Sequence, residues 1–517
     1  MAIEYPDIRA FVQHLAPTWG KHQHENFAQL VRALLQRASL NLSNLARAMP
    51  RSSQPLHGRV KRLDRFLDNP RIDEAALFVR WLDLSYRFGE DLPPASDGRP
   101  ILPLLLDTVY FEPFAMLVTT VPCGSRGLPI ALTTYHRTTL QACFPPKSAW
   151  PPLLQDPRPP CRRKGKRPTP ACAVVTAFDS QNKIEERLIE YVFFLLSPAL
   201  LGVIVADRGF ARASLFWYLL AHKRAFAIRI DGETHIRLPK PLTPDRPDQG
   251  PPGQVLGIRP GQRIWCAQAW YGKEEQVPVS LLAVWDVGQK EPWYIATSLQ
   301  TAQQTETVYR WRMRLELANR DEKTGVILRE GGDQHALMSV MHVHRLLLAL
   351  CTAEWLCALV GLQAWHDLDA PQGADRAAET PPRALSAPIT PSLAEPTVPS
   401  LPQAASPSTP APAKSAGSWI PEWASDPAIL REGPAMPPAI IPHRGQTPQL
   451  PRWMRRFTAR GWLSYVRLGL EVLRSGDLGQ IVRRMVRWLA SYLWPWTPRW
   501  RAWQVRYRMR HWWIDSS

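Results

Sequence analysis

The chain has 517 residues, of which 45% are hydrophobic, and a formal net charge of +18. This length is enough for roughly two to four domains and at least one sizeable core. The basic balance predicts a polyanionic partner, with nucleic acid ahead of an acidic membrane surface. Seven cysteines without a C-x-x-C pair argue against both a disulfide framework and a zinc site. The N-terminus has no signal pattern, so we expect a soluble, cytoplasmic protein.

Residues 1–95 have the pattern of a helical domain. Apolar residues recur at i, i+3 and i+4 over residues 26–38, and Asn41 is placed to cap a short helix that runs through Met49. Residues 57–67 predict a third helix that carries Lys61, Arg62 and Arg65. Short helices with one basic member are typical of a helix-turn-helix DNA reader. They are equally typical of a helical bundle with a solvated basic face.

Residues 96–362 predict an α/β domain built on a mixed sheet. Residues 101–107 form an apolar run that ends in Asp107, the pattern of a buried central strand. Strand-like runs at 116–121 and 128–135 follow around a glycine-containing turn. A helix at 182–196 leads to a second apolar run, 201–207, which ends in Asp207. A helix at 211–222 and a strand at 225–230 complete the parallel part of the sheet.

Residues 231–298 change character and predict a β insertion. A proline-rich linker precedes three strand-like runs, at 263–270, 276–285 and 293–298. A helix is then expected from about residue 304, followed by a long apolar helix at 336–360. The second of these contains His342, His344, Arg345 and Glu354, so we expect a core helix and no membrane span.

Three further segments lack the pattern of a packed core. Residues 144–170 form a proline-rich loop with a basic cluster at 162–167, which either follows a DNA backbone or is simply solvated. Residues 363–450 predict a disordered linker, because residues 371–448 hold 18 of the 52 prolines. Residues 451–517 hold 14 arginines, three acids and nine of the 22 tryptophans. This tail predicts basic helices that grip DNA or lie on an anionic membrane surface.

Asp107, Asp207 and Glu316 are the candidate acidic residues. An aspartate after an apolar strand is, taken alone, most often a turn former or a helix cap. Strand ends at one edge of an open α/β sheet are, however, where functional groups gather. Carboxylates brought together there would repel one another unless cations lay between them. Two Mg²⁺ or Mn²⁺ ions suit such oxygen ligands, whereas zinc does not.

Tyr309, Arg312, Glu316 and Lys323 lie close together on a predicted helix. At about 100° per residue, the other three fall within about 60° of Tyr309. A solvated helix face with i,i+4 charge pairs has the same appearance. The spacing Tyr-x2-Arg-x3-Glu-x6-Lys also resembles the YREK signature of the DDE class of cut-and-paste insertion-sequence transposases. The run Asp207-Arg208-Gly209-Phe210 resembles the setting of the second acid in that family. Residues 63–69 resemble its N-terminal region, which favours DNA binding by residues 1–95.

The resemblance covers residues 20–362 and implies an RNase H-like catalytic core with a β insertion. It implies a DNA transposase that binds the terminal inverted repeats of its element as a homodimer, cleaves the DNA strands and joins the 3′ ends to a target. Asp107, Asp207 and Glu316 would hold two Mg²⁺ or Mn²⁺ ions. Tyr309, Arg312 and Lys323 would hold DNA phosphates near the cut. No small-molecule cofactor and no membrane is expected.

The family resemblance also brings two further expectations. In relatives, a tryptophan of the β insertion stacks on a base flipped out of the DNA, and the candidates here are Trp265, Trp270, Trp285 and Trp293. We expect each of them more often in the core than on a base. The alternative to an active, nucleoid-associated endonuclease is an inactive or domesticated DNA-binding protein on the same fold.

Overall fold

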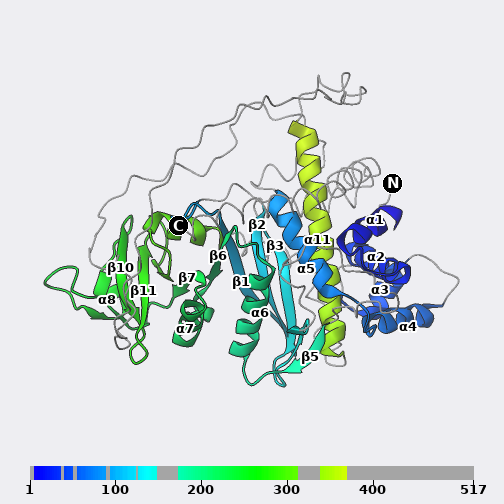
Figure 1. The fold of residues 1–517 in the computed structure, drawn as a ribbon, viewed down its shortest axis with the longest axis horizontal. Coiled ribbons are helices and arrows are strands. Elements are labelled where there is room, and N and C mark those ends of the chain that lie inside the picture. Colours follow the sequence, from blue (N-terminus) through cyan, green and yellow to red (C-terminus); the bar gives the residue numbers. More distant parts are fainter. Residues whose placement is uncertain are drawn as a thin grey trace, which may run out of the picture.

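A twelve-stranded mixed sheet forms the centre of the molecule (Figure 1). The computed structural model describes residues 5–36, 40–49, 55–88, 94–123, 126–147, 173–312 and 338–369. The strand order is β5-β4-β3-β2-β1-β6-β7-β12-β11-β10-β8-β9. The predicted α/β class with a mixed sheet is therefore confirmed.

The strands and helices have the following bounds. The strands are β1 (Ile101–Phe111), β2 (Phe114–Cys123), β3 (Arg126–His136), β4 (Gln141–Phe144), β5 (Val174–Ala177), β6 (Leu201–Ala206), β7 (Ala225–Ile230), β8 (Ile236–Arg237), β9 (Gln249–Gly250), β10 (Arg263–Tyr271), β11 (Val277–Val284) and β12 (Trp293–Thr297). The helices are α1 (Tyr5–Leu15), α2 (Lys21–Gln36), α3 (Leu42–Ala48), α4 (Leu56–Leu67), α5 (Glu74–Phe88), α6 (Gln181–Leu195), the 3₁₀ helix η2 (Arg208–Phe210), α7 (Ala213–Ala221), α8 (Pro252–Leu256), α9 (Ala302–Arg310) and α11 (Val340–Asp369).

The central strands follow the predicted pattern, with one correction. β1, β2 and β3 are antiparallel neighbours, and β1, β6 and β7 are parallel neighbours. β1 does not end at Asp107, as the apolar run suggested, but continues to Phe111. The reason is that β1 has two partners. Its pairing with β6 ends at Leu105, while its hairpin with β2 continues through Asp107 to Phe111.

The three predicted strands of the β insertion are confirmed as β10, β11 and β12. They do not form a separate sheet. β12 pairs antiparallel with β7, with Tyr294 opposite Ile230, so the insertion extends the central sheet without a break. The strands β8 and β9 were not predicted, because each has only two residues and so no alternation to detect.

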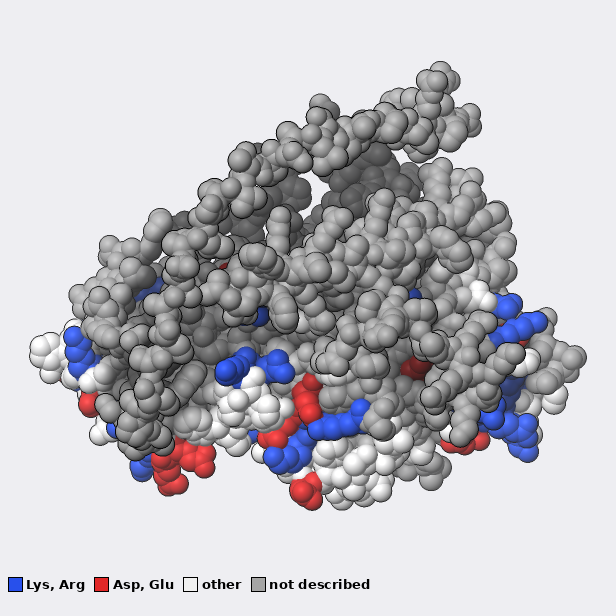
Figure 2. Space-filling view, in the orientation of Figure 1, with Lys and Arg blue, Asp and Glu red and all other residues white. Residues whose placement is uncertain are grey.

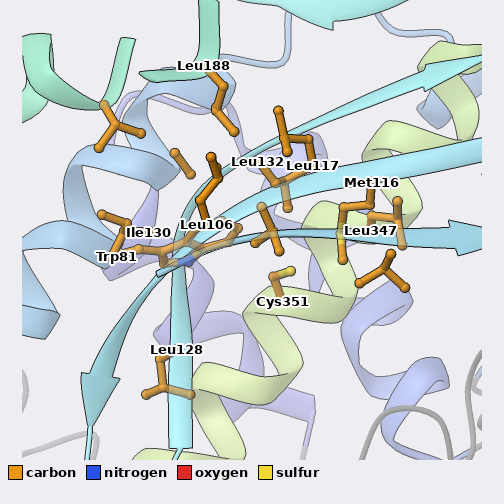
Figure 3. Packing of buried hydrophobic residues seen from close by; sticks show 14 of the residues in the cluster. Trp81, Leu106, Met116, Leu117, Leu128, Ile130, Leu132, Leu188, Leu347 and Cys351 are labelled. Atoms are coloured by element: carbon orange, nitrogen blue, oxygen red, sulfur yellow. The ribbon is translucent and has the colours of Figure 1, made fainter. Parts of the chain in front are cut away.

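The predicted N-terminal helices are confirmed as α2, α3 and α4. Asn41 caps α3 as expected, because its Oδ1 accepts hydrogen bonds from the backbone N–H groups of Ser43 (2.8 Å) and Asn44 (3.3 Å). These helices share one hydrophobic core with the sheet. Figure 3 shows side chains of α5 (Trp81), β3 (Ile130) and α11 (Cys351) packed in this core.

The apolar helix α11 stands between the sheet and the N-terminal helices (Figure 1). Its segment Val340–Gly361 is long and apolar enough to cross a membrane, but 94% of its most apolar window is buried inside the protein. In this structure it is a core helix, as predicted. It continues to Asp369, past the expected domain boundary at residue 362.

Several predictions concern residues that the structure does not describe. Glu316 and Lys323, the basic loop cluster at 162–167, the linker after residue 369 and the tail 451–517 all lie outside the described ranges. The cysteines in the described part of the chain are all buried: Cys123, Cys143, Cys266, Cys351 and Cys357.

Candidate active site

Asp107 and Asp207 lie on one face of the sheet, the face that α9 covers. Successive side chains of a strand point to opposite faces. Leu105 of β1 and Val205 of β6 belong to a buried cluster that also contains Val308 of α9. Each acid follows one of these two residues by two positions, and the backbone at Asp207 is still extended. Both carboxylates therefore point to the side of the sheet on which α9 packs.

The two acids also lie just past the same end of the parallel pairing between β1 and β6. Leu105 and Val205 are the last paired residues of β1 and β6. Asp107 and Asp207 come two residues later, and adjacent strands lie about 4.8 Å apart. Asp107 is half-buried and is held in place by its pairing with Val118 of β2. This register brings together two acids that are 100 residues apart in the sequence.

Asp207 has two described partners. Its Oδ1 accepts a hydrogen bond from the backbone N–H of Gly209 at 2.8 Å, so it caps the 3₁₀ helix η2. Its Oδ2 accepts a hydrogen bond from Nη2 of Arg312 at 3.0 Å. About 40% of the Asp207 side chain is exposed, against 10% of Arg312. Asp207 is thus a helix cap, the ordinary role of an acid after a strand, and it also pairs with a residue of the predicted signature.

The helix α9 carries the first half of the predicted signature. Thr301 caps it through a hydrogen bond from the backbone N–H of Gln304 to Oγ1. Tyr309 is 2% exposed and packs edge-on against Trp293 of β12, with 5.5 Å between the ring centroids. The helix predicted across 309–323 is interrupted, because α9 ends at Arg310. Trp311 has φ −66° and ψ −22°, the tightened 3₁₀ geometry common at helix ends.

An ion-pair network holds α9 against the β insertion. Glu306 accepts hydrogen bonds from Arg310 on the same helix (2.6 Å) and from Arg263 of β10 (2.9 Å). Asp286, just after β11, accepts from the same two arginines at 2.9 Å and 3.0 Å. The hydrogen bonds to Glu306 raise the pKa of Arg263 above its usual value. This network was not predicted from the sequence, although the i,i+4 spacing of Glu306 and Arg310 was a signal for part of it.

The four candidate tryptophans occupy different environments. Trp265 is 6% exposed and is part of the core beneath α9, as expected for most of them. Trp293 is half-buried against the Tyr309 ring. Trp270 lies beneath an arginine of β8, and the indole N–H of Trp285 donates to a main-chain carbonyl. None of the last three is fully buried.

A basic surface lies on α4, away from the acidic residues described above. Lys61 and Arg65 are exposed and four residues apart, so they share one side of the helix. Arg62 donates a hydrogen bond to Asn26 of α2 at 2.8 Å. A pocket of about 330 Å³ lies between these helices, lined by Asn26, Gly58, Arg62, Arg65, Phe66 and Asn69. Figure 2 shows lysine and arginine side chains gathered at this end of the molecule, over the N-terminal helices.

Asp64, Asp68 and His342 form a cluster whose possible ligand atoms lie within 4.8 Å of one another. The imidazole lies between the two acids. Its Nε2 is 2.5 Å from Asp68, and its Nδ1 is 3.9 Å from Asp64. The two ring nitrogens face different carboxylates, and the Nε2 contact with Asp68 is a hydrogen bond that links α11 to the end of α4. We therefore assign this cluster a structural role.

The chain matches no family model and no curated protein. The assignment of the candidate site therefore rests on the geometry of its residues alone. Of the six predicted site residues, the structure places four on one side of the sheet: Asp107, Asp207, Tyr309 and Arg312. The other two, Glu316 and Lys323, lie outside the described residues.

Proposed function

We propose that the protein is a DNA transposase that cleaves and joins DNA strands at the ends of its element in a metal-dependent reaction. One observation carries this proposal. Two acids from distant parts of the chain lie just past the same end of the β1–β6 pairing and on the same face of the sheet, and Arg312 of the signature contacts one of them. If these charged residues only formed a solvated helix face, Arg312 would have no need to contact Asp207.

The arrangement of the central strands supports an RNase H-like core. The antiparallel strands β1 to β3 and the parallel strands β6 and β7 form the order β3-β2-β1-β6-β7. In the proposed fold, the first acid lies on the first strand and the second acid follows the neighbouring parallel strand. Asp107 and Asp207 occupy these positions. The β insertion follows β7 in the chain and precedes α9, which is where the family resemblance places it.

The residues at this site fit a divalent cation with hard oxygen ligands. About 40% of the Asp207 side chain is exposed to solvent, and its carboxylate oxygens are the hard ligands that such ions prefer. Asp107 points to the same face, and Glu316 follows Arg312 by four residues in the sequence. Together they would hold Mg²⁺ or Mn²⁺, which activates the attacking water or 3′-hydroxyl and stabilises the leaving oxygen.

The remaining residues of the site orient the acids and the DNA. The backbone N–H of Gly209 fixes the rotation of the Asp207 carboxylate. Packing of Tyr309 on Trp293 fixes α9 over the sheet. Arg312 and Lys323 supply positive charge for phosphates of the bound strand. The basic surface of α4 provides a further contact for the DNA backbone, and two copies of the chain would bind the two ends of the element.

The alternative is an inactive or domesticated DNA-binding protein with the same fold. Both described acids are intact, and one is already oriented by two hydrogen bonds, which favours an active enzyme. The two functions differ in one measurable property: only the active enzyme cleaves and joins the DNA that it binds.

End cleavage tests the proposed function. The protein is incubated with linear DNA that carries the inverted repeats bordering its gene, with Mg²⁺ or with a chelator. We expect strand breaks at the repeat ends and joined products only with Mg²⁺, and none on a duplex of scrambled ends. Binding of the cognate ends without any strand breakage in Mg²⁺ or Mn²⁺ would instead support the inactive alternative.

Charge reversal on α4 tests its part in DNA binding. We expect Lys61→Glu with Arg65→Glu to weaken DNA affinity on the order of tenfold at moderate salt. The salt dependence should flatten by about 2 units of slope, because two phosphate contacts are lost. Fluorescence anisotropy over a salt series measures both quantities.

The matched control carries the same change in charge elsewhere. Lys147 and Lys183 are each 60% exposed and lie 2.7 Å from a glutamate of α6. Their reversal to glutamate should leave the slope of the salt dependence unchanged. If both double variants lose affinity equally, net charge and not the α4 surface determines binding.

A further inference from the structure

Arg312 is hydrogen-bonded to the carboxylate of Asp207, which the proposed function assigns to a metal ion. Its Nη2 lies 3.0 Å from Oδ2 of Asp207, while Oδ1 of the same acid is bonded to the Gly209 N–H. A charge-assisted hydrogen bond to a carboxylate is among the stronger polar contacts in proteins. The Arg312 side chain is only 10% exposed, so the guanidinium is held against the sheet edge and not extended into solvent.

The neighbouring arginines do not share this position. Arg310, two residues earlier, is bonded to Glu306 and Asp286 at the β insertion. Arg208, the residue after Asp207, lies 3.5 Å from Asp231 and is 55% exposed. Among these three arginines, all within the described residues, Arg312 contacts the candidate metal ligand, whereas Arg310 and Arg208 pair with other acids.

We infer that Arg312 is a cation latch, which neutralises Asp207 in the free protein and is displaced when a divalent cation binds. The inference rests on the proposed metal site. A guanidinium and a metal ion compete for the same carboxylate oxygen, and two cations a few ångströms apart repel each other. Once displaced, the guanidinium is free to bond a DNA phosphate, which presents matching oxygens.

The latch couples the metal to the DNA. A metal ion that frees Arg312 makes this side chain available to a phosphate, and a phosphate that captures Arg312 vacates Asp207 for the metal. Each ligand therefore favours the binding of the other by the same factor. In the free protein the Arg312 guanidinium offsets the negative charge that Asp207 places beside Asp107, and the site becomes competent only when both ligands are present.

Manganese binding by the full-length protein tests the latch without any need for catalysis. Free Mn²⁺ is measured by electron paramagnetic resonance, and the relevant site is the one lost in Asp207→Asn. We expect Arg312→Gln to bind Mn²⁺ at this site about tenfold more tightly than the wild type. Arg312→Lys keeps the charge but loses the planar fork, so its affinity should fall between the two.

Arg208→Gln is the matched control. It removes the same charge from the residue next to Asp207 but leaves the Arg312 contact in place. If it tightens Mn²⁺ binding as much as Arg312→Gln, charge alone explains the effect and the latch is wrong. Unchanged or weaker Mn²⁺ binding in folded Arg312→Gln also overturns the latch while leaving the proposed function intact. Wild-type Mn²⁺ binding that survives both Asp107→Asn and Asp207→Asn contradicts the proposed metal site itself.

A second measurement addresses the coupling. On a duplex without the element's ends, Mn²⁺ should raise the DNA affinity of the wild type. In Arg312→Gln this increase should be at least several-fold smaller, because the released guanidinium is missing. An equal increase in both proteins would show that the metal acts on DNA by another route, and the latch would not account for it.

Discussion

Asp207→Asn is expected to abolish end cleavage while the protein still folds and still binds DNA. The amide keeps an oxygen for the Gly209 N–H and has the same shape, so the η2 cap remains. The ion pair to Arg312 is lost, so circular dichroism is used to confirm that the variant is folded. A neutral amide is, however, a poor ligand for a divalent cation. We expect a loss of cleavage rate of at least about a thousandfold, which corresponds to several kcal/mol of transition-state stabilisation.

The same loss is expected for Asp107→Asn and for Glu316→Gln. Cleavage is followed on labelled inverted-repeat DNA in Mg²⁺, and DNA affinity is measured separately by anisotropy. Asp97→Asn is the control, because Asp97 is 47% exposed and paired with an arginine, like Asp207. It precedes β1, at the opposite end of that strand from the site, so cleavage should be retained. Wild-type cleavage by any of the three site variants would refute the proposed triad.

The part of the site that could be predicted from the sequence is the part that local patterns determine. Apolar runs placed Asp107 and Asp207 on or just after two buried strands, because burial on both faces leaves a continuous hydrophobic signal. The cap at Asn41 and the strands β10 to β12 were predictable for the same local reason. Because successive side chains of a strand point to opposite faces of the sheet, the face on which each acid lies follows once the strand register is known.

The contacts that tie distant segments together could not be predicted in this way. Periodicity reports on neighbouring residues, whereas Arg312 and Asp207 are 105 positions apart. The extension of β1 to Phe111 depends on its hairpin with β2, and the junction of β12 with β7 depends on which sheet edge is free. The continuation of the signature beyond Arg312, with Glu316 and Lys323, remains a prediction.

The buried cluster around Glu74 gives the largest expected effect on stability. Glu74 begins α5 and is 0% exposed, and its Oε1 accepts a hydrogen bond from Nε of Arg345 in α11 at 3.1 Å. Its Oε2 accepts from the backbone N–H of Ala173 at 3.1 Å and lies 3.6 Å from Nε2 of His344. Arg345 also donates to the carbonyl of Leu67 at the end of α4. One carboxylate thus joins the N-terminal helices to the core helix.

Glu74→Gln should destabilise the protein by about 3–5 kcal/mol, because it leaves the buried Arg345 charge uncompensated. Arg345→Met should cost a similar amount by stranding Glu74. The double variant should cost clearly less than the sum, since a buried ion pair replaced by groups of similar volume is often nearly neutral. Urea unfolding followed by circular dichroism measures all three. Additive losses would mean that the two residues do not act as a pair.

The pH dependence of stability gives an independent test of the same cluster. Burial alone raises the pKa of the Glu74 carboxyl, but the nearby His344 imidazole and the hydrogen-bonded Arg345 guanidinium outweigh it and hold the pKa below its usual value of 4.5. A lowered pKa in the folded state means that the stabilisation is fully present above about pH 4.5 and is lost as the pH falls through the folded value. Wild-type stability should therefore fall more steeply below pH 4.5 than that of Glu74→Gln, which has no proton to gain at this position. Parallel acid profiles for the two proteins would show that Glu74 is not ionised in the folded core, and the charge pair would then not explain how α5 and α11 are held together.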